Sequence, residues 1–267
     1  MKSFESITTA HGITDRTGGV SQGVYATMNT SFFGDDDREA VFENIKRSLD
    51  AIMCDAKIIV ATQQVHSNRI QVIDEKTDFS SFTKIDTSGS ALKEHQLYVV
   101  AETDGLMTKR EDVVLMTFYA DCVPLVFFDP VLNIGATVHS GWKGTSNKIG
   151  RDAVSMLISM GCNAHDIKVG IGQSAGVCCY EVDTPVIVLF QKLFSVEDLK
   201  QFVFPKSNEK FMIDLKKANE IICVQSGVLA QNIEIISDCT LCQEALYHSH
   251  RRTGYPRGSM SAFIQLK

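Results

Sequence analysis

The sequence lacks the features that would place the protein in a membrane, on nucleic acid or in the secretory pathway. Its 267 residues include no stretch of about 18 apolar residues, so we expect no membrane-spanning segment. The N-terminus lacks the apolar core of about 7–15 residues that a signal peptide has, which predicts a cytoplasmic protein. Lysine and arginine do not cluster and the net charge is −6, so nucleic-acid binding is not expected.

Linkers rich in serine and glycine, low-complexity tracts and internal repeats are absent as well, and prolines number only five. Apolar residues make up 44% of the chain and charged residues 22%, values that are typical of globular proteins. A chain of this length buries enough surface to fold without disulfide bonds. We therefore expect one domain over residues 1–267.

Apolar runs and turn residues alternate along the chain in an order that interleaves strands with helices. Residues 113–119 and 123–128 are apolar almost throughout, which is typical of strands buried on both faces. The acidic run Asp35, Asp36 and Asp37 is expected to cap the helix that follows it. This order predicts a mixed sheet in a layered α/β or α+β fold. We expect helices at residues 36–53, 145–160, 184–193 and 214–225, and strands from 58 towards 66 and at 97–100, 113–119, 123–128, 134–138, 167–171, 233–236 and 262–266.

Three segments place a reactive side chain between an apolar strand and turn residues, and these side chains are His66, Cys122 and His139. Strand ends favour functional groups because a rigid sheet positions them. A thiolate and two imidazoles suit a catalytic zinc, whose fourth position is left for water. The three residues are far apart along the chain, so Cys122 packed as an apolar residue, with hydrogen-bonded histidines, is the alternative. Asp121, next to Cys122, would either orient a ligand or carry a proton.

Other segments suggest anion or metal binding. Residues 141–145 lie between a strand and a helix, where backbone N–H groups and Lys143 favour a phosphate or carboxylate; a tight turn is the alternative. Arg251 and Arg252 either bind phosphate or pair with acidic neighbours.

The eight cysteines are expected to be free thiols or metal ligands, because no secretory signal accompanies them. Cys239 and Cys242, with His248 and His250, have the spacing of a structural metal site of two cysteines and two histidines; two half-buried cysteines beside a polar loop are the alternative. Cys178 and its neighbour Cys179 would face opposite ways on a strand, so packing is expected for them.

Together these segments resemble the YfiH family, also called the laccase-domain or polyphenol-oxidoreductase family. Each element is weak alone, and their order is what makes the resemblance specific. The elements are residues 16–21, 64–66, 104–108, 120–124, 139–144, 178–182, 214–215, 239–240 and 249–252. The sequence departs from the family at Ser140 and Lys143, which stand where alanine and arginine are usual, at Gln173, which replaces a proline, and at Ser259, which stands where an arginine is usual.

The resemblance implies a single-domain α-β-β-α layered fold of the α+β class with mixed sheets, similar to the catalytic domain of cytotoxic necrotising toxins. It implies zinc ligands at His66, Cys122 and His139. The implied activity is phosphorolysis of adenosine, inosine, guanosine and methylthioadenosine, with adenosine deamination.

Purine nucleosides and phosphate are then the expected partners. The expected catalytic residues are His66, Cys122, His139 and Asp121, and phosphate or substrate would be held by Arg16, Lys143, Arg251 and Arg252.

The laccase name can be tested by counting. Four coppers need roughly ten histidines and this chain has seven, so the residues support one metal site rather than a multi-copper oxidase. Copper is an alternative to zinc because such ligands generally bind copper more tightly. Two other functions stay open: a cysteine hydrolase with Cys122 as nucleophile and His139 as base, and a non-catalytic role in peptidoglycan quality control. The oligomeric state is also open.

Overall fold

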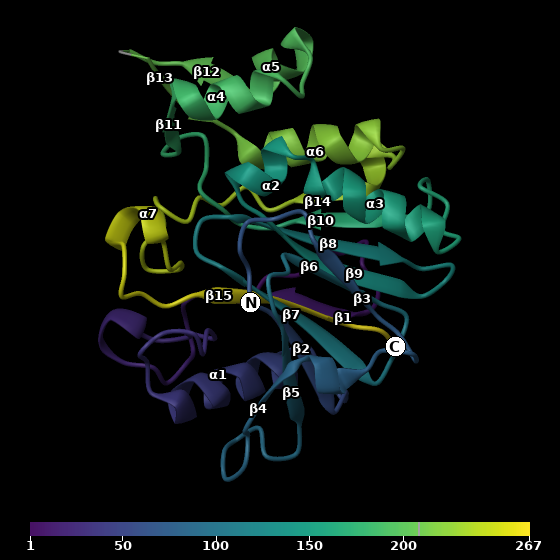
Figure 1. Cartoon of the computed structure of the whole chain (residues 1–267). Coiled ribbons are helices and arrows are strands. Elements are labelled where there is room, and N and C mark those ends of the chain that lie inside the picture. Colours follow the sequence, from purple (N-terminus) through teal and green to yellow (C-terminus); the bar gives the residue numbers. More distant parts are fainter. Residues whose placement is uncertain (208) are drawn as a thin grey trace.

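Two six-stranded sheets stack on one another, and helices cover their outer faces (Figure 1). The computed structural model describes residues 1–207 and 209–267. Helix α1 packs on the first sheet, and helices α3 and α6 pack on the second, so the α-β-β-α layers are confirmed. Both sheets combine parallel and antiparallel pairs, which makes the fold α+β with mixed sheets, as predicted.

The elements have the following bounds. The first sheet has the order β1 (Ala10–Ile13), β15 (Met260–Gln265), β7 (Val113–Tyr119), β2 (Ile58–Thr62), β5 (Gln96–Val100) and β4 (Thr83–Ile85). The second has the order β14 (Ile233–Ile235), β10 (Lys168–Ile171), β8 (Val123–Asp129), β9 (Ile134–Ser140), β6 (Gly105–Thr108) and β3 (Ile70–Ile73). A small third sheet has the order β11 (Glu181–Asp183), β13 (Lys210–Ile213) and β12 (Val203–Pro205). The α-helices are α1 (Arg38–Ala51), α2 (Trp142–Ser146), α3 (Ile149–Ser159), α4 (Thr184–Gln191), α5 (Val196–Phe202), α6 (Leu215–Gln225) and α7 (His250–Thr253).

Strand β7 shows why the layers form. Its side chains alternate, so that Leu115 and Tyr119 enter the core between the two sheets, while Val114 and Met116 enter the core beneath α1. Strand β8 alternates in the same way between the inter-sheet core and the core under α3 and α6. Continuous apolar sequence is required here because both faces of each strand are covered.

Most predicted elements are confirmed, and their errors have local causes. The Asp37 carboxylate accepts hydrogen bonds from the backbone N–H groups of Glu39 and Ala40, which confirms the helix cap. The helix expected at residues 145–160 is wrong in extent: it divides into α2 and α3 because Lys148 has a left-handed backbone, with φ of 62°. The prediction missed β1, β3, β4, β6 and the third sheet, whose strands have only three or four residues each.

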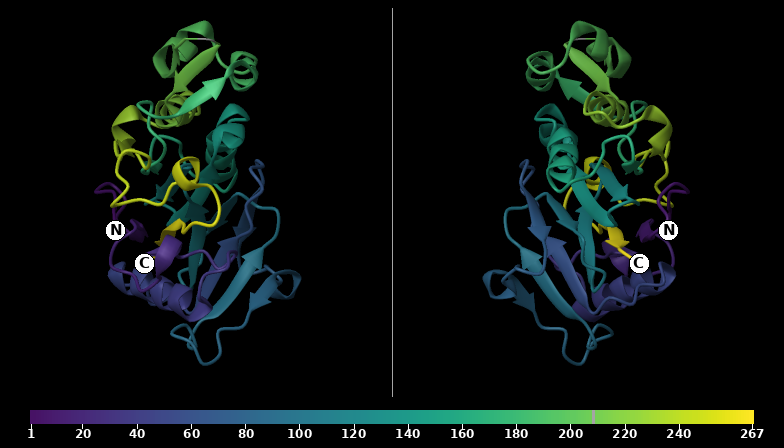
Figure 2. Two further views of the ribbon diagram at one scale, coloured as in Figure 1. Left: turned by 90° about the vertical axis from the view of Figure 1, so that its left-hand side faces the viewer. Right: turned by 90° about the vertical axis from the view of Figure 1, so that its right-hand side faces the viewer.

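Helices α4 and α5 and the third sheet form the end of the molecule remote from α1 (Figure 2). The two chain termini lie near one another in these views, because β1 near the N-terminus pairs with β15 near the C-terminus. Within residues 1–207 and 209–267, no helix combines the length and apolarity needed to cross a bilayer.

Candidate metal centre and active site

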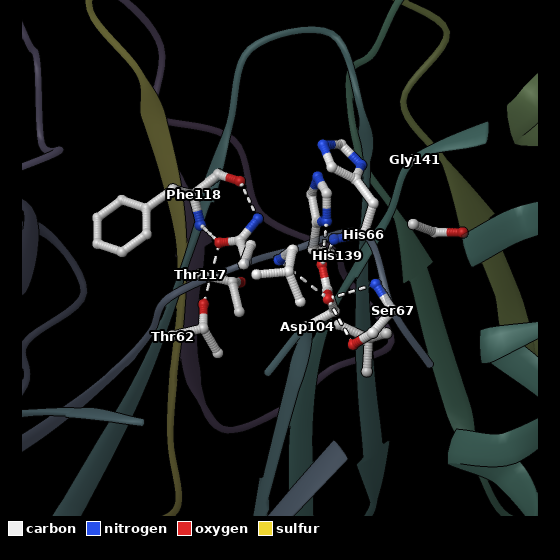
Figure 3. Close-up of polar contacts among 12 residues, drawn as sticks. Thr62, His66, Ser67, Asp104, Thr117, Phe118, His139 and Gly141 are labelled. Carbon is white, nitrogen blue, oxygen red and sulfur yellow. Dashed lines mark hydrogen bonds and ion pairs between the residues drawn. The ribbon is translucent and has the colours of Figure 1, made fainter. Parts of the chain in front are cut away.

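The strand order brings together the three side chains expected to bind a metal. Strands β2 and β7 run parallel, so both end at the same edge of the first sheet. The turn after β7 carries Cys122 and enters β8, whose first residue, Val123, pairs with Ser140 at the end of β9. His66 follows β2 and His139 lies in β9, so one corner between the sheets receives all three. Their donor atoms lie within 4.8 Å of one another, and the two imidazole rings lie side by side (Figure 3).

The carboxylate of Asp104 organises this corner from below. Its Oδ1 accepts hydrogen bonds from His139 Nδ1 at 2.8 Å and from the His66 backbone N–H at 3.0 Å. Its Oδ2 accepts from the backbone N–H groups of Val65 at 3.2 Å and Ser67 at 2.6 Å, and from the Ser67 hydroxyl at 2.7 Å (Figure 3). Asp104 is completely buried, and these five bonds hold the loop that presents His66.

This bonding also sets the tautomer of His139. Burial acts to raise the pKa of Asp104, but the hydrogen bond and charge of His139 and the bonds from Ser67 bring it below its ordinary value. The ionised carboxylate can only accept, so His139 Nδ1 carries the proton and Nε2 is left to bind a metal. A carboxylate behind a ligand histidine is the usual support in zinc sites.

The Cys122 thiol and the His139 imidazole polarise each other. Burial acts to raise the pKa of Cys122, but the charge and hydrogen bonding of His139 and of His66 lower it to about 6. Burial acts to lower the pKa of His139, but the Cys122 charge and the hydrogen bond to Asp104 raise it to about 9. The pair is therefore poised as thiolate and imidazolium, and a metal ion would displace the proton they share.

Gly141 leaves the space that this donor set needs. A Cβ on Gly141 would lie 2.7 Å from His66 Nδ1 and 3.0 Å from Cys122 Sγ, closer than side chains pack. One thiolate and two imidazoles are ligands that zinc accepts, and the missing Cβ keeps their centre clear. The residues present therefore fit a three-ligand metal ion.

A cavity of about 830 Å³ opens in front of the three ligands. Its wall includes the rings of Tyr25, Phe33, Phe118 and Tyr255, together with Arg257. Phe33 and Phe118 pack edge to face with ring centroids 5.4 Å apart. This cavity combines flat apolar surfaces with one guanidinium beside the metal ligands.

The four expected phosphate-binding cations lie elsewhere in the structure. Arg16 donates from Nε to the Ala26 carbonyl, and Arg252 donates to the Thr240 and Tyr247 carbonyls at 2.7 Å. Arg251 stacks on Tyr180 and donates to the Glu181 carbonyl, and Lys143 is exposed above the Trp142 ring. Among the described residues, the cavity wall contains Arg257 and none of these four.

Asp121 adjoins Cys122 in the chain, and its carboxylate binds the C-terminal loops. It accepts hydrogen bonds from Thr240 Oγ1 at 2.6 Å, Ser249 Oγ at 3.0 Å and the Arg251 backbone N–H at 2.6 Å. The contacts of Asp121 thus tie the Cys122 turn to the segment that leads to the cavity.

The set of two cysteines and two histidines suggested by spacing is wrong as a metal site. The thiols of Cys239 and Cys242 lie near those of two other cysteines. The His248 ring is buried against Gly258, and the His250 ring packs against Tyr255 with centroids 4.8 Å apart. His250 turns to the cavity because helix α7 begins at that residue.

Residues 10–267 match the family model described as multi-copper polyphenol oxidoreductase laccase. The chain belongs to this family. It is 33% identical over 257 residues to the purine nucleoside phosphorylase YlmD of Bacillus subtilis (strain 168), covering 96% of this chain and 88% of the relative. It is 29% identical to the adenosine deaminase RL5 of an unknown prokaryotic organism, covering 97% and 92%. The crystal structure of Bacillus licheniformis hypothetical protein YfiH superposes with a TM-score of 0.84 at 34% identity, covering 96% and 92%.

The laccase-family name describes ancestry better than it describes this metal inventory. Among the described residues, the one metal-like cluster that contains histidine is His66, Cys122 and His139.

Sequence reasoning within this laccase-family chain missed three functional candidates: Asp104, Arg257 and His250. Asp104 was visible as the first residue of the motif at 104–108, but its role depends on loops far away in sequence. Arg257 lies two positions before Ser259, so it supplies a guanidinium close to where the usual arginine is absent. His250 was assigned to a metal set on spacing alone.

Proposed function

We propose that the chain is a metal-dependent purine nucleoside phosphorylase that also deaminates adenosine. The observation that carries this proposal is the His66, Cys122 and His139 set at the base of an aromatic-walled cavity. The names of the relatives from Bacillus subtilis and the unknown prokaryote support both activities. Zinc is the proposed ion because one thiolate and two imidazoles with an open side are typical of catalytic zinc.

The residues around the metal position have distinct roles in this proposal. Asp104 holds His139 in the Nδ1–H tautomer, so that the opposite ring nitrogen faces the cavity. The Asp121 carboxylate keeps the Cys122 turn fixed against the C-terminal loops. When bound, the metal supplies a Lewis acid that polarises nearby atoms.

The cavity wall suits a purine nucleoside. The rings of Phe33, Phe118 and Tyr255 offer faces and edges for a flat heterocycle. Arg257 is the phosphate-binding cation we propose, because its guanidinium lines the cavity and can bind two phosphate oxygens. Phosphate contacts by Arg16, Lys143, Arg251 and Arg252 stay a prediction that variants at these positions test.

Phosphorolysis forms a bond from a phosphate oxygen to C1′ of the ribose and breaks the bond from C1′ to the purine nitrogen. The purine leaves with the electron pair and takes up a proton. Burial, and then the charge of Arg257, lower the pKa of His250, so its imidazole is neutral near pH 7. A neutral imidazole at the cavity wall is suited to move protons in this reaction. Deamination instead adds water at C6 of adenine and releases ammonia.

Product analysis tests the proposal. Wild-type protein should release hypoxanthine and ribose 1-phosphate from inosine only when phosphate is present, and ammonia from adenosine without it. Cys122→Ala should lose both activities together with bound metal, while Cys54→Ala, at a partly buried cysteine in the core under α1, should keep them. A metal-free preparation with full activity would refute metal dependence.

A cysteine hydrolase is the second candidate, because Cys122, His139 and Asp104 form a chain of thiolate, imidazole and carboxylate. This function predicts activity that chelators do not reduce and a covalent adduct on Cys122. The phosphorylase predicts that chelators remove activity and that zinc restores it.

A further inference from the structure

Four thiols gather at a second place in the fold, away from the candidate active site. Cys178 and Cys179 lie between β10 and β11, and Cys239 and Cys242 lie between β14 and α7. The four Sγ atoms all lie within 4.8 Å of one another, with Cys242 Sγ 3.4 Å from Cys178 Sγ and 3.2 Å from Cys179 Sγ. Two segments about 60 residues apart in sequence thus supply two thiols each.

The adjacent pair joins this cluster because it lies in a turn, which makes the expectation of opposed strand faces wrong. The backbone N–H groups of Cys179 and Tyr180 both donate to the Gly176 carbonyl at 2.9 Å. This tight turn directs both neighbouring thiols towards Cys242. Gly176 is needed there, since a Cβ would lie 3.0 Å from the Cys239 Cβ and 3.3 Å from two sulfurs.

The dimensions of the cluster are those of a metal cage. Zinc binds thiolates at about 2.3 Å in a tetrahedron, so the sulfurs of a four-cysteine site lie about 3.8 Å apart. The Sγ separations of 3.2 and 3.4 Å, and the 4.8 Å limit for the set, lie on both sides of that value. A disulfide requires about 2.05 Å, and all four cysteines are free thiols here.

Backbone N–H groups from both segments surround one of these sulfurs. Cys239 Sγ accepts a hydrogen bond from the Gly176 N–H at 3.2 Å. Burial acts to raise the pKa of Cys239, but hydrogen bonds from the backbone of Cys242, Gly176 and Leu241 lower it to about 7. The two donors within the Cys239–Cys242 turn come from the second and third residues after the sulfur. Hydrogen bonds of this kind stabilise the thiolate that a metal requires.

A buried cation lies beside the cluster. Lys216 is 6% exposed and donates to the carbonyls of Ser237 at 3.0 Å and Asp238 at 2.8 Å, directly before Cys239. Within residues 1–207 and 209–267 it forms no ion pair with a carboxylate. Burial lowers the pKa of Lys216, and the thiols of Cys239 and Cys178 are among the groups that oppose this. Four thiolates around one divalent ion leave a charge of −2, which a buried ammonium partly offsets.

We propose that Cys178, Cys179, Cys239 and Cys242 bind one zinc ion in a closed tetrahedral site, separate from the candidate active-site metal. Four protein ligands leave no open position, so the role is structural. Both joined segments contact Asp121: the Ala175 backbone N–H donates to its carbonyl at 2.8 Å, and Thr240 Oγ1 donates to its carboxylate. The ion thus fastens the loops that support the turn carrying Cys122.

Metal counting in two complementary double variants tests the proposal. Wild-type protein, purified with zinc and a reducing agent, should contain two zinc ions per chain. His66→Ala/Cys122→Ala removes two active-site ligands and should keep one ion. Cys178→Ser/Cys242→Ser changes two exposed thiols, so it leaves the apolar core intact, and should also keep one. Cys54→Ser should keep two. These counts do not depend on nucleoside turnover.

Spectroscopy and unfolding give independent readouts. With cobalt in place of zinc, the intense visible absorption of a tetrahedral tetrathiolate should remain in His66→Ala/Cys122→Ala and disappear in Cys178→Ser/Cys242→Ser. Chelation should lower the Tm of the first variant and leave that of the second unchanged. A His66→Ala/Cys122→Ala protein that holds no metal overturns the proposal, whether or not the serine variant folds. Iron in place of zinc, or only six titratable thiols in metal-free wild type before any reduction, would overturn it too.

Discussion

Replacing Asp104 by asparagine should weaken metal binding, although Asp104 is not itself a proposed ligand. The wild-type carboxylate accepts five hydrogen bonds, from Val65, His66, Ser67 and His139. Asparagine keeps one acceptor oxygen and turns an NH2 group towards the other donors. Either the His139 side or the Ser67 side then has donor facing donor in a fully buried place.

The expected loss can be derived from these contacts. Hydrogen bonds to a charged group contribute about 1.5–3 kcal/mol each, and breaking a buried charged pair costs about 3–5 kcal/mol. We therefore expect the free energy of unfolding to fall by about 3–5 kcal/mol. Loss of the carboxylate behind a ligand histidine should weaken zinc binding by about tenfold to a hundredfold.

Acid sensitivity supplies a second signature of the Asp104→Asn change. Because the folded-state pKa of Asp104 lies below its unfolded value, the carboxylate stabilises the fold above about pH 4, and this contribution is lost as the pH falls further. The variant lacks this group, so its unfolding free energy should decline less between pH 5 and pH 3, values that bracket about pH 4.

Urea unfolding and competition with a chromophoric chelator measure these effects. Asp129→Asn is the matched control, since Asp129 is fully buried and accepts from the backbone N–H groups of Val131 and Leu132 at 2.8 Å, outside the ligand corner. It should lose stability and keep its zinc affinity. A folded Asp104→Asn protein with wild-type zinc affinity would refute the role assigned to this carboxylate.

Three further predictions concern the ligand corner and its cavity. Gly141→Ala should reduce zinc affinity at least tenfold because its Cβ would lie 2.7 Å from a ligand ring nitrogen, whereas Gly150→Ala, with no contact under 3.5 Å, should bind zinc normally in the same titration. In metal-free protein, iodoacetamide labelling of Cys122 should rise with a midpoint near pH 6, read by peptide mass spectrometry, and zinc should suppress it; a midpoint near the ordinary value of about 8.5 would contradict the thiolate pair. Arg257→Gln should raise the KM for phosphate about tenfold or more, the loss of one charge-assisted bond, while Lys143→Gln should leave it unchanged; equal effects would count against Arg257 as the phosphate cation.

Local patterns allowed much of the fold to be predicted. The apolar run at residues 113–119 became β7 with both faces buried, and Asp37 caps α1 as its position suggested. The helix at 145–160 failed because a left-handed residue such as Lys148 has no side-chain signature. The convergence of His66, Cys122 and His139 was suggested by residue chemistry and by a resemblance to a family, since their spacing alone carried no such information.

Sequence by itself determined which segments are strands and helices, and which side chains carry chemistry, because periodicity and residue type are properties of neighbouring residues. Tertiary structure decided which of these side chains meet. The crossing from β7 into β8 places Cys122 between two histidines, and a turn on Gly176 brings adjacent cysteines to Cys239. The same long-range packing buries Asp104 under both histidines and turns Arg257 into the cavity. Such contacts depend on strand order and loop path, which hydrogen bonds between distant segments specify.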